Sequence, residues 1–382
     1  MRKGVAMQKN NSESRNYSLD LLRIVCMLMI VFMHMQTHGG IEQLWCNTQY
    51  ISLIMRWMTI VSSCAVNIFV MISGYYLSNQ GVKLTSLVKT IIQVLFYSWT
   101  ICVVLLFTKR LNPSSEDLIK SICPISFRKY WFATSYVGLC LISPFINNSL
   151  KFMNKRQHCS LIVLLLIMMS VVSDIIPGSS AFNVDSGYSI VWFVVLYIIS
   201  SYIRKYVDLE KVSRKRLVSI FFICSIFILF STKILASLIE RYSFLSRVLF
   251  DTYYCRYNSI LIVIESCCLF LIFLKINVIK KWEIGCIGFF APLSFGVYLI
   301  SDNNPLRDII WKFVRYFGAF DISIAMIPIK SLLFVFVVYV LCALVDKVRM
   351  ALFIYLYQIK PVKELLVWLD DKWNSIFGTM SK

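Results

Sequence analysis

The first apolar stretch, residues 16–40, reads NYSLDLLRIVCMLMIVFMHMQTHGG, and two of its ionisable side chains, Arg23 and His34, could do chemistry. Arg23 and His34 are eleven positions apart, a helical rotation of about 1100°, or about 20° beyond three full turns. Both therefore lie on one helix face, about 16 Å apart along the axis. A neutral imidazole can remove a proton near neutral pH, and a guanidinium binds anions through a planar set of donors. One helix could thus hold two reacting groups.

The spacing leaves two interpretations of these residues open. Ionisable side chains inside a membrane-spanning helix cost about 3 kcal/mol or more, so they normally face a cavity or a partner and mark a functional site. Alternatively, Arg23 reaches the cytoplasmic interface with its long side chain, and His34 is a hydrogen-bonded core residue. Asp20 precedes Arg23 by about one turn, and His38 follows His34 by about one turn, on a similar stripe.

The composition places this helix in a membrane protein. Of the 382 residues, 58% are hydrophobic and 15% charged, and the mean hydropathy is +0.72. Soluble domains have about 45–50% apolar and about 25% charged residues. Apolar runs of about 18 residues or more recur, and these can cross a hydrocarbon core about 30 Å thick. Because backbone amides in lipid must be satisfied within the segment, we expect an all-α protein, a polytopic membrane helix bundle of about ten transmembrane helices.

The expected spans divide the chain into three parts. They are approximately Leu19–Thr37, Trp57–Leu77, Val88–Thr108, Tyr130–Leu150, Ser160–Ile176, Tyr188–Ile203, Leu217–Ala236, Ser259–Leu274, Gly285–Ile300 and Ile327–Val345. Residues 1–18 form a cytoplasmic N-terminal segment, and residues 19–346 form the transmembrane domain. Residues 347–382 mix apolar and basic residues, so we expect a cytoplasmic amphipathic tail that is broken at Pro361.

The distribution of charge predicts the topology. The net charge is +19, but the basic residues lie in short loops between apolar runs, so we expect a lipid bilayer and no nucleic acid as partner. The loops on the side of the N-terminus carry roughly twice as many Lys and Arg as the opposite loops. The positive-inside rule then places both termini in the cytoplasm of a multi-pass protein of the inner (plasma) membrane. The exception is Lys109–Lys129, an outer loop with five basic residues that is a candidate functional surface.

Four sequence features, in this order, resemble acyltransferase family 3, whose members are membrane proteins that acylate sugars and other acceptors. The features are Leu19-Asp20 with Arg23 and His34, the sequence NIFVMISGYYL over residues 67–77, Tyr130-Trp131-Phe132 with Pro144, and the sequence LSFGVYLI over residues 293–300. The resemblance covers about Tyr17–Val345 and joins motifs from several spans.

Two positions depart from the family pattern. Many members follow the last motif with a histidine, where this chain has Ser301 and Asp302. Many members also open the third span with an Arg-x-x-Arg pair, where this chain has Lys83 and Lys89. A lysine keeps the charge but lacks the planar guanidinium that grips phosphate in two places. The departures therefore concern the binding of the acyl donor more than the class of reaction.

The resemblance implies a membrane-bound O-acyltransferase that moves acetyl from acetyl-CoA to a sugar hydroxyl of a surface polysaccharide or its lipid-linked precursor. Its partners would be acyl-CoA as co-substrate and a saccharide acceptor, with no permanently bound cofactor. His34 would be the general base. Arg23, together with Lys83 and Lys89, would bind the donor. Asp20 would complete the catalytic group by orienting Arg23, or would form only a structural ion pair with it.

Five further residues are candidates for binding the acceptor. They are Ser73, Tyr75, Trp131, Tyr136 and Glu265. The serine lacks the flanking glycines of a nucleophile elbow, and with its neighbouring glycine it also fits close helix packing in lipid. The three aromatic residues can stack on a sugar ring or belong to interfacial belts. The glutamate lies within a span and is a cavity candidate. His158 is expected to be solvated in a short basic loop, and the cysteines lack metal-ligand spacing, so no metal site is expected.

Two other function classes compete with acyl transfer. A transporter or flippase of lipid-linked saccharides would line its path with Arg23 and His34. Transporters tend to show internal repeats and matched helices broken by Gly or Pro, and 13 Gly with 8 Pro give little sign of either. A polysaccharide polymerase would be expected to carry a large arginine-rich outer loop, whereas the longest outer loops here have only about twenty residues.

Overall fold

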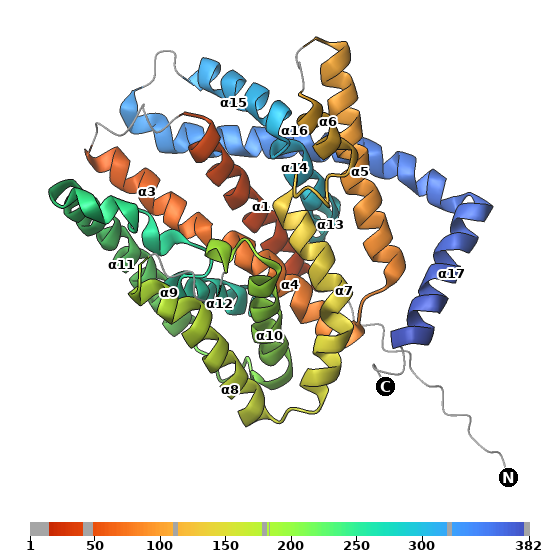
Figure 1. Ribbon diagram of the computed structural model, residues 1–382, viewed down its shortest axis with the longest axis horizontal. Helices are drawn as coiled ribbons and strands as arrows, with labels where there is room; N and C mark the ends of the chain where they lie inside the picture. The colour runs from red at the N-terminus through yellow and green to blue at the C-terminus, as the bar shows by residue number, and fades with distance from the viewer. Residues whose placement is uncertain are drawn as a thin grey trace.

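The chain folds into a bundle of helices (Figure 1). A computed structural model describes residues 15–40, 49–109, 114–177, 182, 184–318 and 323–377, and no strand occurs among them. The main helices are α1 (Tyr17–His38), α3 (Gln49–Ser63), α4 (Ala65–Gln80), α5 (Leu84–Phe107), α6 (Ser115–Ile122), α7 (Trp131–Lys151), α8 (Lys155–Leu166), α9 (Val172–Ile175), α10 (Ile190–Tyr206), α11 (Arg214–Arg241), α12 (Ile260–Leu274), α13 (Lys281–Phe290), α14 (Ser294–Ser301), α15 (Asn304–Gly318), α16 (Ile327–Gln358) and α17 (Lys360–Phe377). The expected all-α polytopic class is confirmed.

Eight helical stretches in the described ranges are long and apolar enough to cross a membrane. They are Tyr17–His38, Tyr50–Gln80, Leu84–Phe107, Lys155–Ile175, Arg214–Arg241, Tyr253–Leu274, Lys281–Ser301 and Ile327–Gln358. The other two expected spans are helical as α7 and α10, but α10 has only 17 residues. The number of ten spans and the cytoplasmic placement of the termini therefore stay predictions.

Helix α1 lies in the middle of the bundle (Figure 1). The side chain of Asn16 caps its start by accepting hydrogen bonds from the backbone amides of Ser18 and Leu19. An acidic first turn with Asp20 and a last turn with His38 suit the helix dipole. Helices α3, α4 and α12 to α16 all pack against α1. Side chains of α1 can therefore meet residues from much of the chain.

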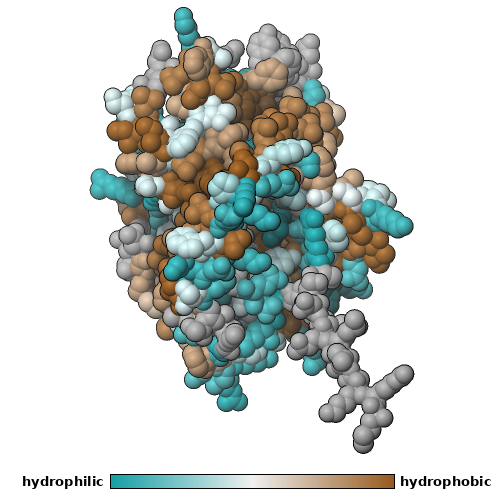
Figure 2. Space-filling model, turned by 90° about the vertical axis from the view of Figure 1, so that its right-hand side faces the viewer, coloured by the Kyte–Doolittle hydropathy of each residue, from teal (hydrophilic) through white to brown (hydrophobic). Residues whose placement is uncertain are grey.

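The outer surface of the bundle is apolar, as a lipid-facing surface must be. Large hydrophobic side chains of α5, α11 and α16 are exposed, among them Trp99, Phe230 and Phe336. In Figure 2, hydrophobic residues cover most of the upper part of one face, and hydrophilic residues gather lower on it. A soluble monomer rarely exposes such continuous apolar surface. The chain is a multi-pass membrane protein.

Helices α4 and α10 approach each other closely at Gly74. A Cβ atom built on this glycine would lie 2.3 Å from Ser200 Oγ and 3.0 Å from the Cα atom of Tyr197. Small residues allow such close contact between helices in lipid. This contact supports the packing interpretation of the Ser73-Gly74 pair.

The C-terminal part of the chain is formed by α16 and α17. Helix α16 does not end near Asp346 but continues to Gln358, and α17 follows at once with Pro361 in its first turn, where a missing amide is tolerated. The α17 helix packs against the start of α5. There the backbone amide of Thr85 donates to Asp370 Oδ1 at 2.7 Å, and Thr85 Oγ1 donates to the carbonyl of Leu366 at 3.0 Å.

Candidate functional site

A cavity of about 470 Å³ opens beside the C-terminal part of α1. Six α1 residues line it, from Met27 to His38, and His34 is one of them. The remaining lining comes from α4, α7, α14, α15 and the segments that precede α7, α10 and α12. From Met27 to His38 the helix rises about 16 Å, so the cavity extends along this length of α1. It ends one helical turn from Arg23.

His34 faces a carboxylate in this cavity. Its Nε2 atom lies 3.7 Å from Asp302 Oδ1, and the two side chains are 15% and 11% exposed. Asp302 Oδ1 also lies 3.3 Å from Nη1 of Arg307. His34 Nδ1 is buried, with no hydrogen-bond partner among the described residues. We assign the proton to Nε2 because the carboxylate favours it there, which leaves the lone pair of Nδ1 to accept a proton.

Asp302 is held in place by the junction of α14 and α15. It follows the last residue of α14, and its backbone amide donates to the carbonyl of Tyr298 at 2.9 Å. The next residue, Asn303, is buried and donates to the hydroxyl of Tyr130 at 2.7 Å. The sequence interpretation gave Asp302 no role. The only signal was that it stands where related chains have a histidine.

Aromatic rings form one wall of the cavity. Trp131 stacks on Tyr257 with ring centroids 5.9 Å apart and an interplanar angle of 16°. Tyr188 lies 4.4 Å from Trp131, and Phe132 lies 5.8 Å from Tyr298, each between ring centroids. Flat aromatic faces suit the apolar faces of sugar rings. The structure thus brings Trp131, a predicted acceptor-binding residue, into the same cavity as His34.

The basic loop that was expected on the outer side reaches this cavity. Arg128 and Lys129 both line it. Arg128 has a φ of 52° and donates to Asp185 Oδ2 at 3.1 Å. Lys129 donates to Ser121 Oγ at 2.9 Å, and burial lowers the pKa of its ammonium group. The loop therefore adds positive charge to the mouth of the cavity.

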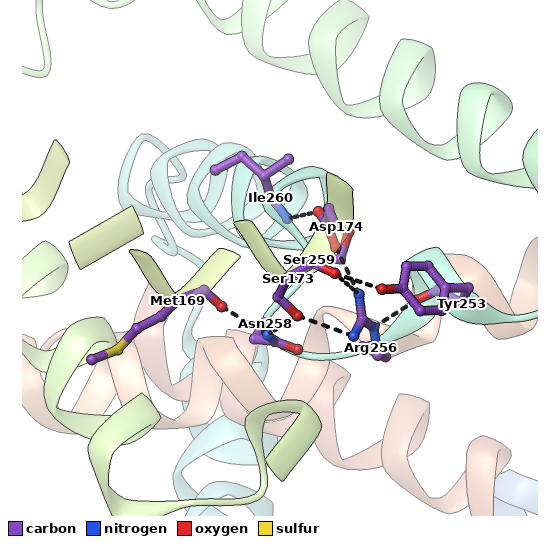
Figure 3. Close-up of polar contacts among 8 residues, drawn as sticks. All are labelled: Met169, Ser173, Asp174, Tyr253, Arg256, Asn258, Ser259 and Ile260. Atoms are coloured by element: carbon purple, nitrogen blue, oxygen red, sulfur yellow. Dashed lines mark hydrogen bonds and ion pairs between the residues drawn. The ribbon is translucent and has the colours of Figure 1, made fainter. Parts of the chain in front are cut away.

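A buried polar network holds the segment that carries Tyr257 (Figure 3). Arg256 and Asp174 point toward each other, with Nη2 and Oδ1 3.0 Å apart and side chains that are 11% and 7% exposed. Arg256 also donates to the hydroxyl and carbonyl oxygens of Ser173, both at 3.1 Å. Asp174 Oδ2 accepts from the backbone amide of Ile260 at 2.9 Å, at the start of α12. The network fixes the preceding segment against α9.

A second contact fixes Tyr257 from the other side. Asn67 of α4 is fully buried, and its Nδ2 atom donates to the carbonyl of Tyr257 at 2.8 Å. Its Oδ1 atom accepts from Nε1 of Trp192 at 3.1 Å. Sequence reasoning found neither this amide nor the Asp174–Arg256 pair, because their partners are far away in the chain.

Replacing Arg256 with alanine is expected to destabilise the protein by about 3 kcal/mol or more, because Asp174 would stay buried without its partner. Thermal unfolding of the purified protein checks this. Arg128→Ala is the control, since the Arg128–Asp185 pair is exposed and should contribute only about 0–1 kcal/mol. Equal, small shifts in both variants would contradict the anchoring role of Arg256.

Arg23 and Asp20 lie near the opposite end of α1. Arg23 Nη1 donates to Asp20 Oδ1 at 3.0 Å, and Arg15 also pairs with Asp20. The Arg23 guanidinium lies 5.6 Å from the ring centroid of Tyr76. The structure therefore pairs Asp20 with Arg23, whereas the carboxylate beside His34 is that of Asp302.

Ser73 and Tyr136 lie between these two regions. Ser73 Oγ donates to the carbonyl of Phe69 at 3.2 Å. Each lies one turn deeper than a cavity-lining residue of its own helix, Phe69 for the serine and Phe132 for the tyrosine. Tyr136 and Phe132 stack with an interplanar angle of 6°. Both predicted residues thus continue the cavity wall in the direction of Arg23.

The other predicted binding residues do not line the cavity. Tyr75 lies under the guanidinium of Arg204, 4.6 Å from ring centroid to Cζ. Lys83 is exposed at the start of α5, and Lys89 lies 4.7 Å from the ring centroid of Tyr357. Glu265 is fully buried in α12, and neither of its carboxyl oxygens has a hydrogen-bond partner among the described residues.

The expectation for His158 is wrong. It was expected to be solvated, but it is fully buried in α8, and its Nε2 atom lies 3.0 Å from the carbonyl oxygen of Ile198. The apolar face of α8 turns this residue toward α10. Within the described ranges, no three His, Cys, Asp or Glu residues are placed to hold a metal ion.

Comparison with protein families gives one finding. A family model described as an acyltransferase domain matches residues 16–346. The matched stretch begins at the cap of α1 and ends within α16, so it contains Arg23, His34 and Asp302. No curated protein and no solved structure matches the chain.

Proposed function

The chain belongs to the acyltransferase family whose model spans residues 16–346, and from this membership we propose a specific reaction for it. The protein is a multi-pass membrane acyltransferase. In the proposed reaction it transfers acetyl from acetyl-CoA to a sugar hydroxyl of a surface polysaccharide or its lipid-linked precursor. We place it in the inner (plasma) membrane, with the Arg23 end of α1 toward the cytoplasm.

The proton transfer falls to His34. A sugar hydroxyl bound against Trp131 gives its proton to Nδ1 of His34 as its oxygen attacks the thioester carbonyl. The tetrahedral intermediate collapses, the carbon–sulfur bond breaks, and the thiolate of CoA takes the proton from the imidazolium. Asp302 faces the other ring nitrogen and stabilises the positive charge on the imidazolium.

The depth of the cavity is the observation that carries this proposal. The cavity follows α1 from His38 to Met27 and ends one turn from Arg23. A donor held at Arg23 by its phosphates or pantetheine arm can therefore extend its thioester along the helix toward His34. The arm is extended and its length is comparable with the roughly 16 Å between Arg23 and His34. The acceptor enters from the opposite side, past Arg128 and Arg307.

Isolated membranes test the reaction. Membranes that contain the wild-type chain would receive labelled acetyl-CoA, and the polysaccharide and lipid-linked saccharide fractions would be counted for label. The proposal expects label in one of these fractions, released by mild base as expected for an ester. Absence of label from every saccharide fraction would favour the transport alternative.

Arg23→Lys is expected to raise the KM for acetyl-CoA about tenfold with little change in kcat, because the ammonium group loses the second donor to an anionic group. Initial rates at varied acetyl-CoA measure this. Asp20→Asn separates donor binding from helix packing. If the Asp20–Arg23 ion pair is merely structural, Asp20→Asn and Arg23→Lys should change the KM for acetyl-CoA equally. Arg216→Gln, an exposed change in α11, is the control. An unchanged KM in Arg23→Lys would contradict donor binding by Arg23.

A further inference from the structure

A second cavity, of about 380 Å³, lies where α4, α7 and α10 end. Three basic residues line it, and none of its lining residues is acidic. Its polar lining includes Lys151, Arg204, Lys205, Asn79, Asn147 and Ser201. A cavity with this lining has a strongly positive potential and hydrogen-bond donors in addition.

This basic cavity lies at the opposite end of the helices from His34. On α4, Phe69 lines the His34 cavity and Ser78 lines the basic cavity, nine residues or about 14 Å further along. On α7, Phe132 lines the His34 cavity and Asn147 lines the basic cavity, fifteen residues or about 22 Å further along. The basic cavity therefore lies toward the end of the bundle where α1 carries Arg23.

Two aromatic rings connect the basic cavity with Arg23. The guanidinium of Arg204 lies 4.6 Å from the ring centroid of Tyr75. The guanidinium of Arg23 lies 5.6 Å from the ring centroid of Tyr76. The two tyrosine rings are perpendicular neighbours, 6.0 Å apart. A chain of cation–ring and ring–ring contacts thus runs from Arg204 at the cavity to Arg23.

We infer that the basic cavity binds the phosphate groups of a nucleotide-bearing acyl donor, with Lys151, Arg204 and Lys205 opposite the phosphates. The inference rests on the proposed function for the identity of the donor. Charge-assisted hydrogen bonds from arginine and lysine are the strong contacts to phosphate, and arginine adds a planar fork. Three cations from α7 and α10 would then replace the paired arginines that the start of α5 lacks.

The positive-inside rule alone explains basic loops but not this arrangement. Lys155, Arg156 and Arg214 on the same side are exposed, as Lys151 and Lys205 are, but they line neither cavity. The phosphate of an anionic lipid headgroup presents the same charged oxygens to the cavity as the phosphates of a soluble donor. The experiment must therefore separate the soluble donor from the lipid.

The test measures the binding of CoA itself, without an acyl group or an acceptor. The full chain in nanodiscs of zwitterionic phosphatidylcholine would be titrated with CoA, 3′-dephospho-CoA and pantetheine. Lys151→Gln/Lys205→Gln is expected to weaken CoA at least tenfold and to leave the weaker binding of pantetheine unchanged. Lys155→Gln/Lys211→Gln, two exposed basic residues outside the cavity, should bind CoA as the wild type does.

Two outcomes would overturn the inference. One is an equal dissociation constant for CoA in the wild type and the Lys151→Gln/Lys205→Gln variant. The other is a variant that loses binding of phosphatidylglycerol but not of CoA, which would assign the cavity to lipid headgroups. The single change Lys205→Glu repeats the test in a second variant. Because no acetyl is transferred in these titrations, their result is independent of whether acetyl reaches a saccharide.

Discussion

Replacing His34 with glutamine is expected to lower kcat for acyl transfer by about 10²–10⁴-fold, the range for loss of a general base. Glutamine keeps a polar side chain of similar length but cannot take the hydroxyl proton at neutral pH. Donor binding should persist, because Arg23 lies about 16 Å away along α1. Rates with labelled acetyl-CoA, together with the dissociation constant for CoA, measure both effects.

Two other histidines provide the controls for this prediction. His38 lines the same cavity, with its ring centroid 6.3 Å from that of His34, and His158 is buried in α8 outside the cavity. For His158→Gln, the rate at saturating acceptor divided by the rate at limiting acceptor should equal the wild-type value. A kcat of His34→Gln within a few-fold of wild type, or a larger loss in His38→Gln, would contradict the assignment of the base.

Asp302→Asn is expected to lower kcat about 100-fold or more while the KM for acetyl-CoA changes little. The amide keeps the shape of the side chain but removes the charge that faces Nε2 of His34 at 3.7 Å. Both the proton position on the ring and the stability of the imidazolium depend on that charge. Single-turnover rates at saturating donor would isolate the chemical step.

The neighbouring charges on α15 show whether this effect is local. Asp308 is 66% exposed and lies 4.0 Å from Nε of Arg307, so Asp308→Asn is the matched control and should be nearly silent. Arg307→Gln removes the other partner of Asp302. If Arg307→Gln reproduces the full loss of Asp302→Asn, the carboxylate acts through Arg307 and not through His34.

The membrane-spanning helices could be predicted because their signal is local. Each expected span is a run of apolar residues, and each falls on helical structure, although three are divided over consecutive helices: Trp57–Leu77, Ser160–Ile176 and Gly285–Ile300. The pairing of Arg23 and His34 on one face also followed from helical periodicity alone. Periodicity could not decide whether Arg23 and His34 have a functional or only a structural role. The cavity beside His34 and its Nδ1 atom, which has no hydrogen-bond partner among the described residues, favour the functional role.

The carboxylate beside His34 could not be predicted, because its position depends on tertiary packing. Asp302 reaches the cavity through the contact of α14 with α1 and through the bond from Asn303 to Tyr130, 173 residues away in the chain. Sequence spacing pointed instead to Asp20, which is local to α1 and pairs with Arg23.

The same reason applies to the second cavity and to α15. Helix α15 follows the last family motif, where a connecting outer segment was expected, and it supplies Arg307 to the His34 cavity. The basic cavity gathers residues of α4, α7 and α10 that are up to 127 positions apart. A charge count along the sequence registers these residues only as part of the positive-inside bias.

In the proposed reaction, donor and acceptor meet at His34 from opposite sides of the membrane. Proteoliposomes with the purified chain in one orientation, enclosing or excluding the host polysaccharide, would receive labelled acetyl-CoA on one side. We expect label on the polysaccharide only when acetyl-CoA is on the Arg23 side and the polysaccharide is on the Arg128 side, and no label with His34→Gln. Transfer only when both are on the same side, or equal transfer by His34→Gln, would contradict it.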